Sequence, residues 1–228
     1  MNEKYFILLL AGSGTRLYSK IHMKKQFYPL SGKPMFCHPL KSAIESDLFS
    51  KIVLVIDKED EEKVKNIVRK EYPDICFLYA YGGKDRNASV QNGLSALKGH
   101  SRMDATVYIH DSDRVLLSAS YLLQMDEEFR GYDAMTPALS LHDSILRSEG
   151  NQISYLNRDG LYLVQTPQVF RLDKILSLYE HGYDQKDTDD FKKAVTTGMK
   201  THIIPGKYEN FKVTTIDELA LIERIFRK

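Results

Sequence analysis

Short apolar runs that alternate with helical patterns constrain the fold of this chain more than any other feature. The runs are rich in β-branched and aromatic residues, which favour strands: "YFILLLA" (5–11), "KIVLVID" (51–57), "ICFLYA" (75–80) and "ATVYIH" (105–110). They are apolar on both faces, as in a parallel sheet that helices cover on both sides. Helical patterns occupy 35–46, 59–71 and 86–98. The order strand, helix, strand, helix predicts a doubly wound α/β fold with a mostly parallel sheet.

The region from about 138 to 160 departs from this alternation. There "ALSLHDSILRSEGNQISYLNRDGLYLV" alternates apolar and polar residues around the turn signal Glu149-Gly150-Asn151, which predicts a protruding β-hairpin. An excursion of this length commonly serves as an arm between subunits or as a lid. The chain then returns through "HIIP", a short "FKVTT" strand (211–215) and a closing helix over 215–227. Because no linker or repeat is visible, we expect a single domain over 1–228.

Composition excludes several classes of partner. The 228 residues are 43% hydrophobic, enough for a full core, and their net charge of +1 gives no basic face for nucleic acid. No apolar run approaches the roughly 20 residues of a membrane span, and the N-terminal run is too short for a secretory signal. Cys37 and Cys76 lie far apart without metal-ligand spacing, so we expect two buried thiols. We therefore expect a soluble, cytoplasmic protein with no nucleic-acid or membrane partner.

The loop after the first strand is the first candidate ligand site, since ligands of α/β sheets collect at the carboxyl ends of strands. Gly12 and Gly14 can take positive φ and point backbone N–H groups at phosphate oxygens, while Arg16 and Lys25 supply positive charge. The loop lacks the Gly-Lys-Ser/Thr ending of a Walker A motif and the third glycine of a Rossmann fingerprint. A plain turn is the alternative.

The second candidate is "YGGKDRNASVQNG" (81–93), after the third strand. Gly82-Gly83 predicts a tight turn, and Asn87, Ala88 or Ser89 could begin the next helix. The loop is either a helix cap without a ligand, or a loop whose backbone groups recognise the edge of a pyrimidine base.

The third candidate is "YIHDSDR" (108–114), at the end of the fourth strand. Asp111 is placed where a carboxylate could hold Mg²⁺ against a polyphosphate, although a solvated cap is the alternative. No two histidines have metal-ligand spacing, and we expect His110 to be structural. Together the three loops predict transfer at phosphorus by positioning and charge, without a covalent nucleophile.

The chain resembles the 2-C-methyl-D-erythritol 4-phosphate cytidylyltransferases and their relatives, the D-ribitol-5-phosphate cytidylyltransferases. Six blocks carry the resemblance over nearly the whole chain: "LLLAGSGTRL", "KQF", "GGKDRNASVQNGL", "YIHDSDR", "QTPQVF" (165–170) and "NFKVTTIDELALIE". The resemblance implies a Rossmann-like fold of the nucleotide-diphospho-sugar transferase type. It also implies that CTP and a polyol phosphate are the substrates, with Mg²⁺ as the cofactor.

The resemblance assigns roles to individual residues by motif match. Arg16, Lys25 and Lys212 would be the catalytic cations that hold the triphosphate and stabilise charge at the α-phosphorus. Asp111 would orient the metal-bound nucleotide and contact the metal, with Arg114 supporting its loop. The other nucleotide-binding positions would be Leu10, Ala11, Gly12, Gly14, Gly83 and Ser89, the cytosine being recognised by Gly83, Ser89 and the backbone around Leu10 and Ala11.

The hairpin at 138–160 would, by the same resemblance, interlock the two subunits of a homodimer and carry acceptor contacts into the neighbouring site. The acceptor-binding positions would be Ser144, which replaces the usual threonine, Arg158, Thr166 and Thr188. An oxygen of the acceptor phosphate would attack the α-phosphorus in line, and an ionised phosphate needs no general base.

Two departures from the family pattern bear on these roles. A proline usually precedes the lysine of "KQ"; here Met23 and Lys24 do, so Lys24 rivals Lys25 as the triphosphate ligand. The usual "HDAARP" block contains Asp113 and Val115 here, which retunes metal binding or marks a catalytically degenerate, nucleotide-binding homologue.

The acceptor is also left open between two polyol phosphates. "RNASVQN" and "HDS" favour the ribitol-phosphate enzymes, which make CDP-ribitol, whereas "SVQNGL" and "KVTTIDELALIE" favour the methylerythritol enzymes. We favour the methylerythritol enzymes. This predicts 4-diphosphocytidyl-2-C-methyl-D-erythritol and pyrophosphate as products, in isoprenoid precursor synthesis by the non-mevalonate pathway.

Overall fold

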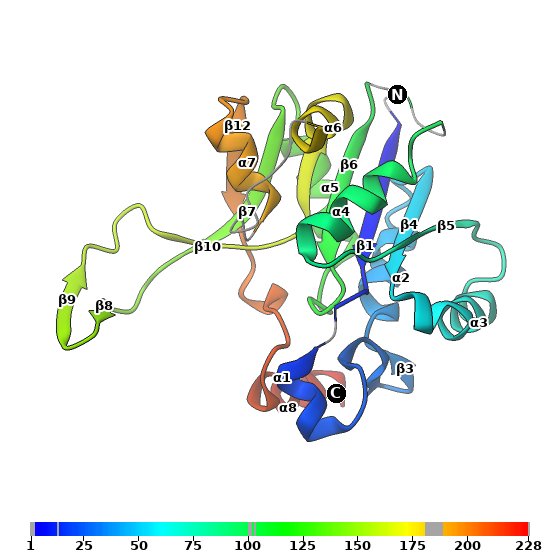
Figure 1. The fold of residues 1–228 in the computed structure, drawn as a ribbon, viewed down its shortest axis with the longest axis horizontal. Helices are drawn as coiled ribbons and strands as arrows, with labels where there is room; N and C mark the ends of the chain where they lie inside the picture. The colour runs from blue at the N-terminus through cyan, green and yellow to red at the C-terminus, as the bar shows by residue number, and fades with distance from the viewer. Residues whose placement is uncertain (1–2, 13, 100–101, 103, 181–188, 228) are drawn as a thin grey trace.

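A mixed eight-stranded sheet forms the centre of the protein in the computed structural model, which describes residues 3–12, 14–99, 102, 104–180 and 189–227, with only the backbone of Thr15 and Arg16. Its strands are β1 (Lys4–Leu9), β4 (Lys51–Ile56), β5 (Phe77–Tyr81), β6 (Thr106–Asp111), β7 (Ala134–Ser140), β10 (Tyr162–Val164), β11 (Gln168–Arg171) and β12 (Thr201–Pro205). The strand order is β10-β7-β11-β6-β1-β4-β5, with β12 beside β7 (Figure 1).

The four strands predicted from their apolar runs form the parallel part of this sheet, in the order β6-β1-β4-β5. Ile7 of β1 lies opposite Val53 of β4 and Ile109 of β6. Successive side chains of a strand point to opposite faces, so Phe6 packs into one core layer and Ile7 into the other. Strands of this kind are mostly apolar because both of their faces are buried. The predicted parallel sheet with both faces covered is therefore confirmed.

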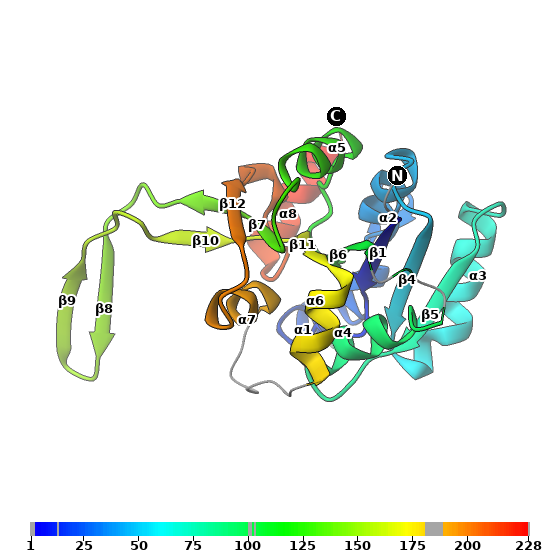
Figure 2. The same ribbon diagram turned by 90° about the horizontal axis from the view of Figure 1, so that it is seen from above.

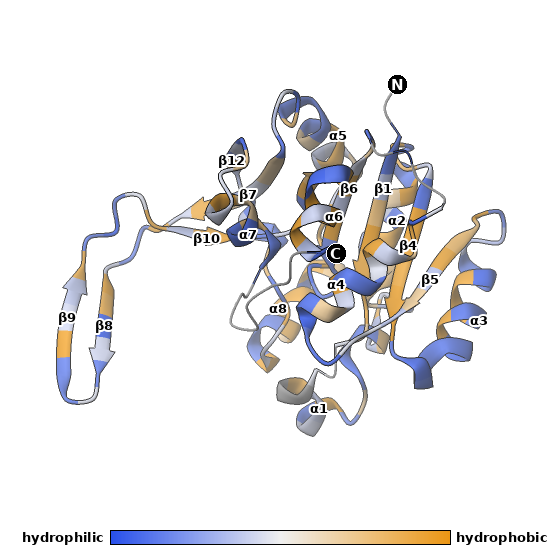
Figure 3. Ribbon diagram, turned by 45° about the horizontal axis from the view of Figure 1, so that its top comes forward, coloured by the Kyte–Doolittle hydropathy of each residue, from blue (hydrophilic) through white to orange (hydrophobic). Residues whose placement is uncertain are grey.

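Helices cover both faces of the sheet, which confirms the doubly wound α/β arrangement (Figure 2). The helices α2 (Cys37–Glu45), α3 (Glu61–Glu71) and α5 (Ala119–Glu128) pack on one face. On the other lie α4 (Arg86–Ser95), α6 (Leu172–Glu180) and α7 (Asp190–Thr196). Figure 3 shows the apolar colour concentrated on β1, β4 and β5 between these layers. The helical patterns at 35–46, 59–71 and 86–98 are thus confirmed, with later starts or earlier ends.

Gly93 sets how closely α4 approaches the sheet. A Cβ atom at this position would lie 2.9 Å from Cγ2 of Ile7 and 2.9 Å from Cγ2 of Val55. A larger residue would push the helix away from β1 and β4, and with it the loop that precedes the helix. The glycine therefore fixes the position of the second candidate ligand loop.

The segment after β1 and the C-terminal segment meet below the carboxyl ends of the strands, where α1 (Thr15–Ile21) lies beside α8 (Ile216–Phe226) (Figure 1). Leu17 of α1 packs with Val213, Leu219 and Ile222 in a separate small core. The short elements η1 (Lys25–Phe27), β2 (Pro29–Leu30) and β3 (Lys33–Pro34) follow α1, and η2 (Lys58–Asp60) follows β4. This packing brings the "KQF" and "FKVTT" blocks to the same side of the sheet.

The strand predicted over 211–215 is wrong. The segment runs between η3 (Tyr208–Asn210) and α8, and it makes no strand. The Glu218 carboxylate accepts hydrogen bonds from the backbone N–H groups of Thr214 and Thr215, at 2.6 and 2.7 Å, as part of a capping box on α8. Those N–H groups are therefore unavailable to a sheet, and Val213 N–H instead donates to the Asp113 carbonyl at 2.9 Å.

The predicted hairpin is confirmed as β8 (Ile145–Glu149) and β9 (Gln152–Leu156), which extend far from the body of the molecule (Figure 1). Gly150 takes a φ of 61° in the turn, a conformation that glycine adopts without strain. Every residue of β9 is exposed. The adjoining strands β7 and β10 pair with each other and connect this arm to the main sheet.

The expectation of two buried thiols is wrong for one of them. Cys37 is buried in α2. Cys76 is exposed because β5 begins at Phe77 and leaves Cys76 in the preceding loop. Over the described residues, no helix is long and apolar enough to cross a membrane.

Candidate active site

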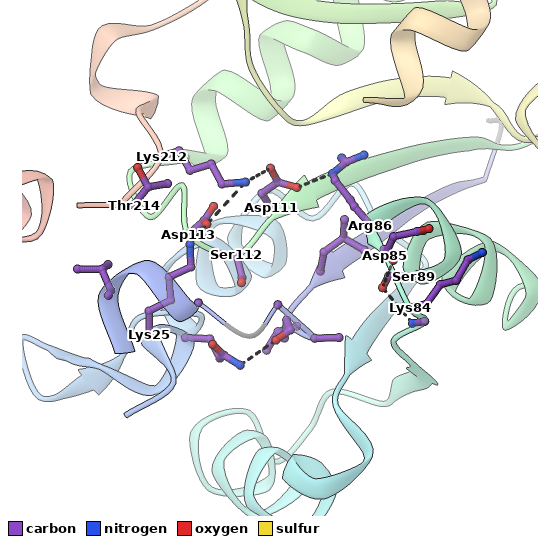
Figure 4. Close-up of a pocket in the computed structure, with 18 residues that line it drawn as sticks. Lys25, Lys84, Asp85, Arg86, Ser89, Asp111, Ser112, Asp113, Lys212 and Thr214 are labelled. Carbon is purple, nitrogen blue, oxygen red and sulfur yellow. Dashed lines mark hydrogen bonds and ion pairs between the residues drawn. The ribbon is translucent and has the colours of Figure 1, made fainter. Parts of the chain in front are cut away.

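A pocket of about 490 Å³ opens at the carboxyl edge of the parallel strands (Figure 4). It is lined by the end of β1 and the loop after it, the loop between β5 and α4, the end of β6, and the segment before α8. The lining residues are Leu9, Leu10, Ala11, Gly12, Gly14, Leu17, Lys25, Gln26, Gly83, Lys84, Asp85, Arg86, Ser89, Asp111, Ser112, Asp113, Lys212 and Thr214. All three predicted ligand loops therefore meet here.

The loop after β1 contributes backbone to the pocket, and η1, which follows α1, contributes Lys25. Gly14 has a φ of 59° and precedes α1; a Cβ there would lie 3.1 Å from Cγ of Lys25, so the lysine stem runs directly against this glycine. The buried amide of Gln26 donates to the Leu10 carbonyl at 2.9 Å and fixes the end of the strand. The side chain of Arg16 lies outside the described residues, and only its backbone is placed, in the first turn of α1.

Lys24 and Lys25 point to different places. Lys25 lines the pocket, and its Nζ forms an ion pair with Asp113 and donates to the Val213 carbonyl at 3.2 Å. Lys24 Nζ instead lies 2.9 Å from Asp57 and 2.7 Å from Asp60, and the residue is not among those that line the pocket. Of the two lysines, only Lys25 is positioned to contact a ligand in the pocket.

The loop between β5 and α4 is rigid and closely packed. A Cβ on Gly82 would lie 2.2 Å from Cβ of Ala11, and one on Gly83 would lie 2.3 Å from Cβ of Ala88. The Ser89 hydroxyl accepts from Gly83 N–H at 3.1 Å and donates to the Asp85 carbonyl at 2.9 Å. The helix begins at Arg86, with Asp85 as its cap, so the start predicted within 87–89 is slightly late.

Asp111 is the charged centre of the pocket (Figure 4). Its Oδ2 lies 2.9 Å from Lys212 Nζ and its Oδ1 lies 3.2 Å from Arg86 Nε. Burial favours the neutral acid, but the charges of Arg86 and Lys212 outweigh burial and hold the pKa of Asp111 far below its ordinary value. Burial likewise lowers the pKa of Lys212, and the Asp111 and Asp113 carboxylates more than reverse that effect, so its pKa is raised. Both groups are charged at neutral pH.

Arg86 is a pocket residue that the sequence did not identify. It bridges Asp111 to Asp190, whose Oδ2 lies 2.7 Å from Arg86 Nη1 and which is fully buried. Asp190 is held by the Gln168 side chain, which accepts from its N–H at 3.1 Å, and by the Tyr179 hydroxyl. The only sequence signal was an arginine inside a candidate ligand loop. Its partner is far away in the chain, so the bridge becomes visible only in the folded protein.

Residues behind the pocket brace Asp111 without lining the cavity. The Thr166 hydroxyl accepts from Asp111 N–H at 3.1 Å and lies 3.0 Å from Nδ1 of His110. Burial lowers the pKa of His110 to about 4, so the ring is neutral, which fits the expected structural role. Arg114 donates to the Asn210 carbonyl at 2.8 Å and supports the loop from outside the pocket.

Of the four expected acceptor residues, the three that the structure describes are not brought together within one chain. Thr166 is buried beside Asp111, whereas Ser144 and Arg158 are exposed on the arm and do not line the pocket. Arg158 donates to the His142 carbonyl within the arm. Thr188 lies outside the described residues.

The carboxylates of the pocket suit a divalent cation that is shared with phosphate oxygens. No group of three or more His, Cys, Asp or Glu side chains forms a complete metal site in the part of the chain that the structure describes. Asp111 and Asp113 both face the pocket, and Oδ1 of Asp113 is buried without a hydrogen-bond partner. Mg²⁺ in nucleotide sites is commonly held by one or two carboxylates together with phosphates, and this donor set fits that pattern.

Relatives of known sequence match nearly the whole chain. The model of the family described as 2-C-methyl-D-erythritol 4-phosphate cytidylyltransferase matches residues 5–228. A protein of that name from Thermotoga neapolitana is 31% identical over 97% of this chain and 96% of its own length. Another from Geobacillus thermodenitrificans is 32% identical over 96% of this chain and 95% of its own.

A solved structure agrees with these sequence matches. The crystal structure of 4-diphosphocytidyl-2C-methyl-D-erythritol synthase from Anaerococcus prevotii superimposes with a TM-score of 0.84 and 27% identity, over 100% of this chain and 99% of the other. The Rossmann-like fold is thereby confirmed. The chain belongs to the 2-C-methyl-D-erythritol 4-phosphate cytidylyltransferase family, a family of nucleotidyltransferases.

Proposed function

We propose that this chain joins CTP to 2-C-methyl-D-erythritol 4-phosphate and releases pyrophosphate. The observation that carries the proposal is the convergence of Lys25 and Lys212, from opposite ends of the chain, on the pocket beside Asp111. Family membership adds the nature of the two substrates. The intact ion pairs of the pocket argue against a degenerate homologue that only binds nucleotide.

The base and the triphosphate have separate places in the pocket. The rigid loop with Gly83 and Ser89 faces the end of β1 at Leu10 and Ala11, and backbone groups on both sides are available to recognise the edge of cytosine. Lys25 and Lys212 lie at the other end of the lining, beside Asp113, where the phosphates would bind. A rigid base site of this kind discriminates by hydrogen bonding and by size.

Transfer follows from positioning and charge. An acceptor phosphate oxygen attacks the α-phosphorus, a new P–O bond forms, and the bond from the α-phosphorus to the bridging oxygen breaks, with its electron pair leaving on pyrophosphate. Lys25 and Lys212 stabilise the negative charge that accumulates on the phosphates during this step. The attacking phosphate is already ionised, so no general base is needed, and His110 lies buried behind the pocket.

We assign Asp111 as the residue that holds Mg²⁺ near the phosphates. The bound ion supplies positive charge that offsets the charge of the triphosphate. Arg86 and Lys212 fix the orientation of the Asp111 carboxylate, and Thr166 fixes its backbone.

We also propose a homodimer in which the arm completes the acceptor site of the other subunit. In support, the arm carries Ser144 and Arg158 away from the pocket of its own chain and exposes Leu146, Ile153 and Tyr155. Apolar side chains on a thin protruding hairpin need a partner to be buried. We place the reaction in the cytoplasm, where free thiols such as those of this chain persist.

Pyrophosphate release tests the proposed function. The protein is incubated with CTP and Mg²⁺ and with either 2-C-methyl-D-erythritol 4-phosphate or D-ribitol 5-phosphate, in parallel. We expect faster release with the first acceptor. Faster release with the second would keep the mechanism and replace the acceptor, and no release with either would overturn the proposal.

A further inference from the structure

Asp113 occupies a place in the pocket that the proposed reaction does not explain. Its side chain is only 8% exposed and lies just beyond the end of β6, two residues after Asp111. Oδ2 of Asp113 pairs with Lys25 Nζ and lies 3.7 Å from Lys212 Nζ, so one carboxylate oxygen faces both of the lysines expected to hold the triphosphate (Figure 4).

The other oxygen of Asp113 has no hydrogen-bond partner. Oδ1 is buried, and leaving a buried carboxylate oxygen without a donor is costly, because it has lost its water and gained nothing in return. By contrast, both oxygens of Asp111 contact cations. Asp113 therefore lines a pocket that is suited to a polyphosphate, and one of its carboxylate oxygens has no hydrogen-bond donor.

Asp113 also changes the charge that an incoming nucleotide meets. Lys25 and Lys212 are already paired with Asp113 and Asp111, so two positive charges are balanced by two negative ones. A triphosphate without metal would have to displace a carboxylate from Lys25 and then lie beside it. A divalent cation between the carboxylate and the phosphates would turn that repulsion into attraction, since Mg²⁺ binds oxygen ligands of both kinds.

We propose that Asp113 is a second metal ligand of this site: it holds Lys25 and Lys212 while no nucleotide is bound, and it transfers to the divalent cation when the metal–nucleotide complex enters. The inference rests on the proposed binding of CTP. Its consequence is that binding of CTP depends on Mg²⁺ much more strongly than two lysines and Asp111 alone would require.

Calorimetric titration with CTP, in Mg²⁺ and then in EDTA, tests this role. In the unmodified protein Mg²⁺ should tighten CTP binding strongly. In Asp113→Asn, which keeps the size of the side chain but removes its charge, CTP should bind at least about tenfold more tightly in EDTA than it does to the unmodified protein. The gain in affinity from Mg²⁺ should shrink by a similar factor.

Asp60→Asn is the matched control. It also removes one carboxylate from an ion pair with a lysine, Lys24, but it lies outside the pocket lining. The gain in CTP affinity from Mg²⁺ should be the same in this variant as in the unmodified protein. Thermal unfolding of each variant verifies the fold first, and Asp113→Ser provides a second neutral variant.

The outcomes separate this inference from the proposed function. If the unmodified protein binds CTP but the neutral variants at position 113 keep its full dependence on Mg²⁺, the role of Asp113 is overturned. If those variants lose affinity equally in Mg²⁺ and in EDTA, Asp113 is only a structural anchor for Lys25, which also overturns the inference. If the unmodified protein binds no CTP under either condition, the proposed function itself fails.

Discussion

The pocket and the β8–β9 arm are built in opposite ways from the same chain. Around the pocket, buried and half-buried charges neutralise one another within one subunit: Asp111 with Lys212 and Arg86, and Arg86 again with Asp190. On the arm, Tyr155 is 76% exposed, and among the residues that the structure describes the two strands pair only with each other. A two-stranded hairpin is marginal by itself in water. The nucleotide site can therefore be complete in one chain, whereas the acceptor site that we propose needs the arm of another.

The largest effect should follow from removing a cation of the pocket. Lys212→Ala should lower kcat by about 10²–10³-fold, because a preorganised positive charge at the reacting phosphate is lost. Pyrophosphate release under saturating substrates measures it. Lys24→Ala is the control: its ion pairs lie outside the pocket, so it should keep the wild-type rate. Equal rates for both variants would contradict a catalytic role for this pocket.

The arm should affect the acceptor but not the nucleotide. Arg158→Ala should raise KM for the acceptor about 10- to 100-fold, the value of a charged hydrogen bond to phosphate, and leave KM for CTP unchanged. Steady-state kinetics with each substrate varied in turn measure both constants. An unchanged acceptor KM would contradict an acceptor role for the arm.

Mixing the two defective chains sharpens this prediction. In a dimer of one Lys212→Ala and one Arg158→Ala subunit, an arm that acts in the partner's site leaves one site fully intact. After random subunit exchange, activity should recover to about one quarter of the wild-type value. Activity no greater than that of the separate variants would show that each arm serves its own chain or none.

The buried side of the pocket should make the protein sensitive to acid. Burial lowers the pKa of His110 to about 4 from 6.5, so as the pH falls the unfolded chain binds this proton before the folded protein does. The stability that comes from neutral His110 is complete above about pH 6.5 and is lost towards pH 4; about 2 kcal/mol should be gone at pH 5.

His110→Gln should flatten this dependence, as measured by urea unfolding at pH 7.5 and pH 5. His142→Gln replaces an exposed histidine near the arm and is the control, which should follow the wild-type profile. If His110→Gln loses as much stability as the wild type between the two pH values, the acid sensitivity has another origin.

The smallest effect on the fold should come from the arm. Tyr155→Ser removes a side chain that is 76% exposed, so the free energy of unfolding of the single chain should change by less than about 0.5 kcal/mol. The same change should weaken the dimer, and sedimentation velocity over a range of concentrations measures that. If the Tyr155→Ser variant dimerises as strongly as the wild type, Tyr155 is not part of the proposed interface.

Much of the fold could be predicted because its causes are local. The runs at 5–11, 51–57 and 105–110 are buried on both faces, and strands of that kind are apolar at every position. The segment 211–215 is also rich in β-branched and aromatic residues, but the N–H groups of Thr214 and Thr215 donate to Glu218, as part of a capping box on α8. This competition for hydrogen bonds depends on where the closing helix begins and how it is capped. The strand predicted over 211–215 is wrong for this reason.

The candidate site was predictable to the extent that each loop carries its own chemistry. Gly14 follows β1 and Asp111 is the last residue of β6, and the carboxyl ends of parallel strands meet at one edge; Lys25 reaches the same pocket from η1. Arg86 was missed because its role depends on an ion pair with Asp190, a residue that is far away in the chain and contacts Arg86 only in the folded protein. The assignments of Ser144, Arg158, Thr166 and Thr188 to the acceptor stay predictions, as does the single domain over 1–228.

The sequence by itself determined the α/β class, the order of the strands' apolar runs, the hairpin and the family, because periodicity and motif order are properties of neighbouring residues. Only the tertiary structure decided which charges meet. It separated Lys25 from Lys24, placed Asp113 between two lysines, and left Oδ1 of Asp113 without a partner. The physical reason is that electrostatic interactions fall with distance in space, and the fold brings together residues that the chain keeps far apart.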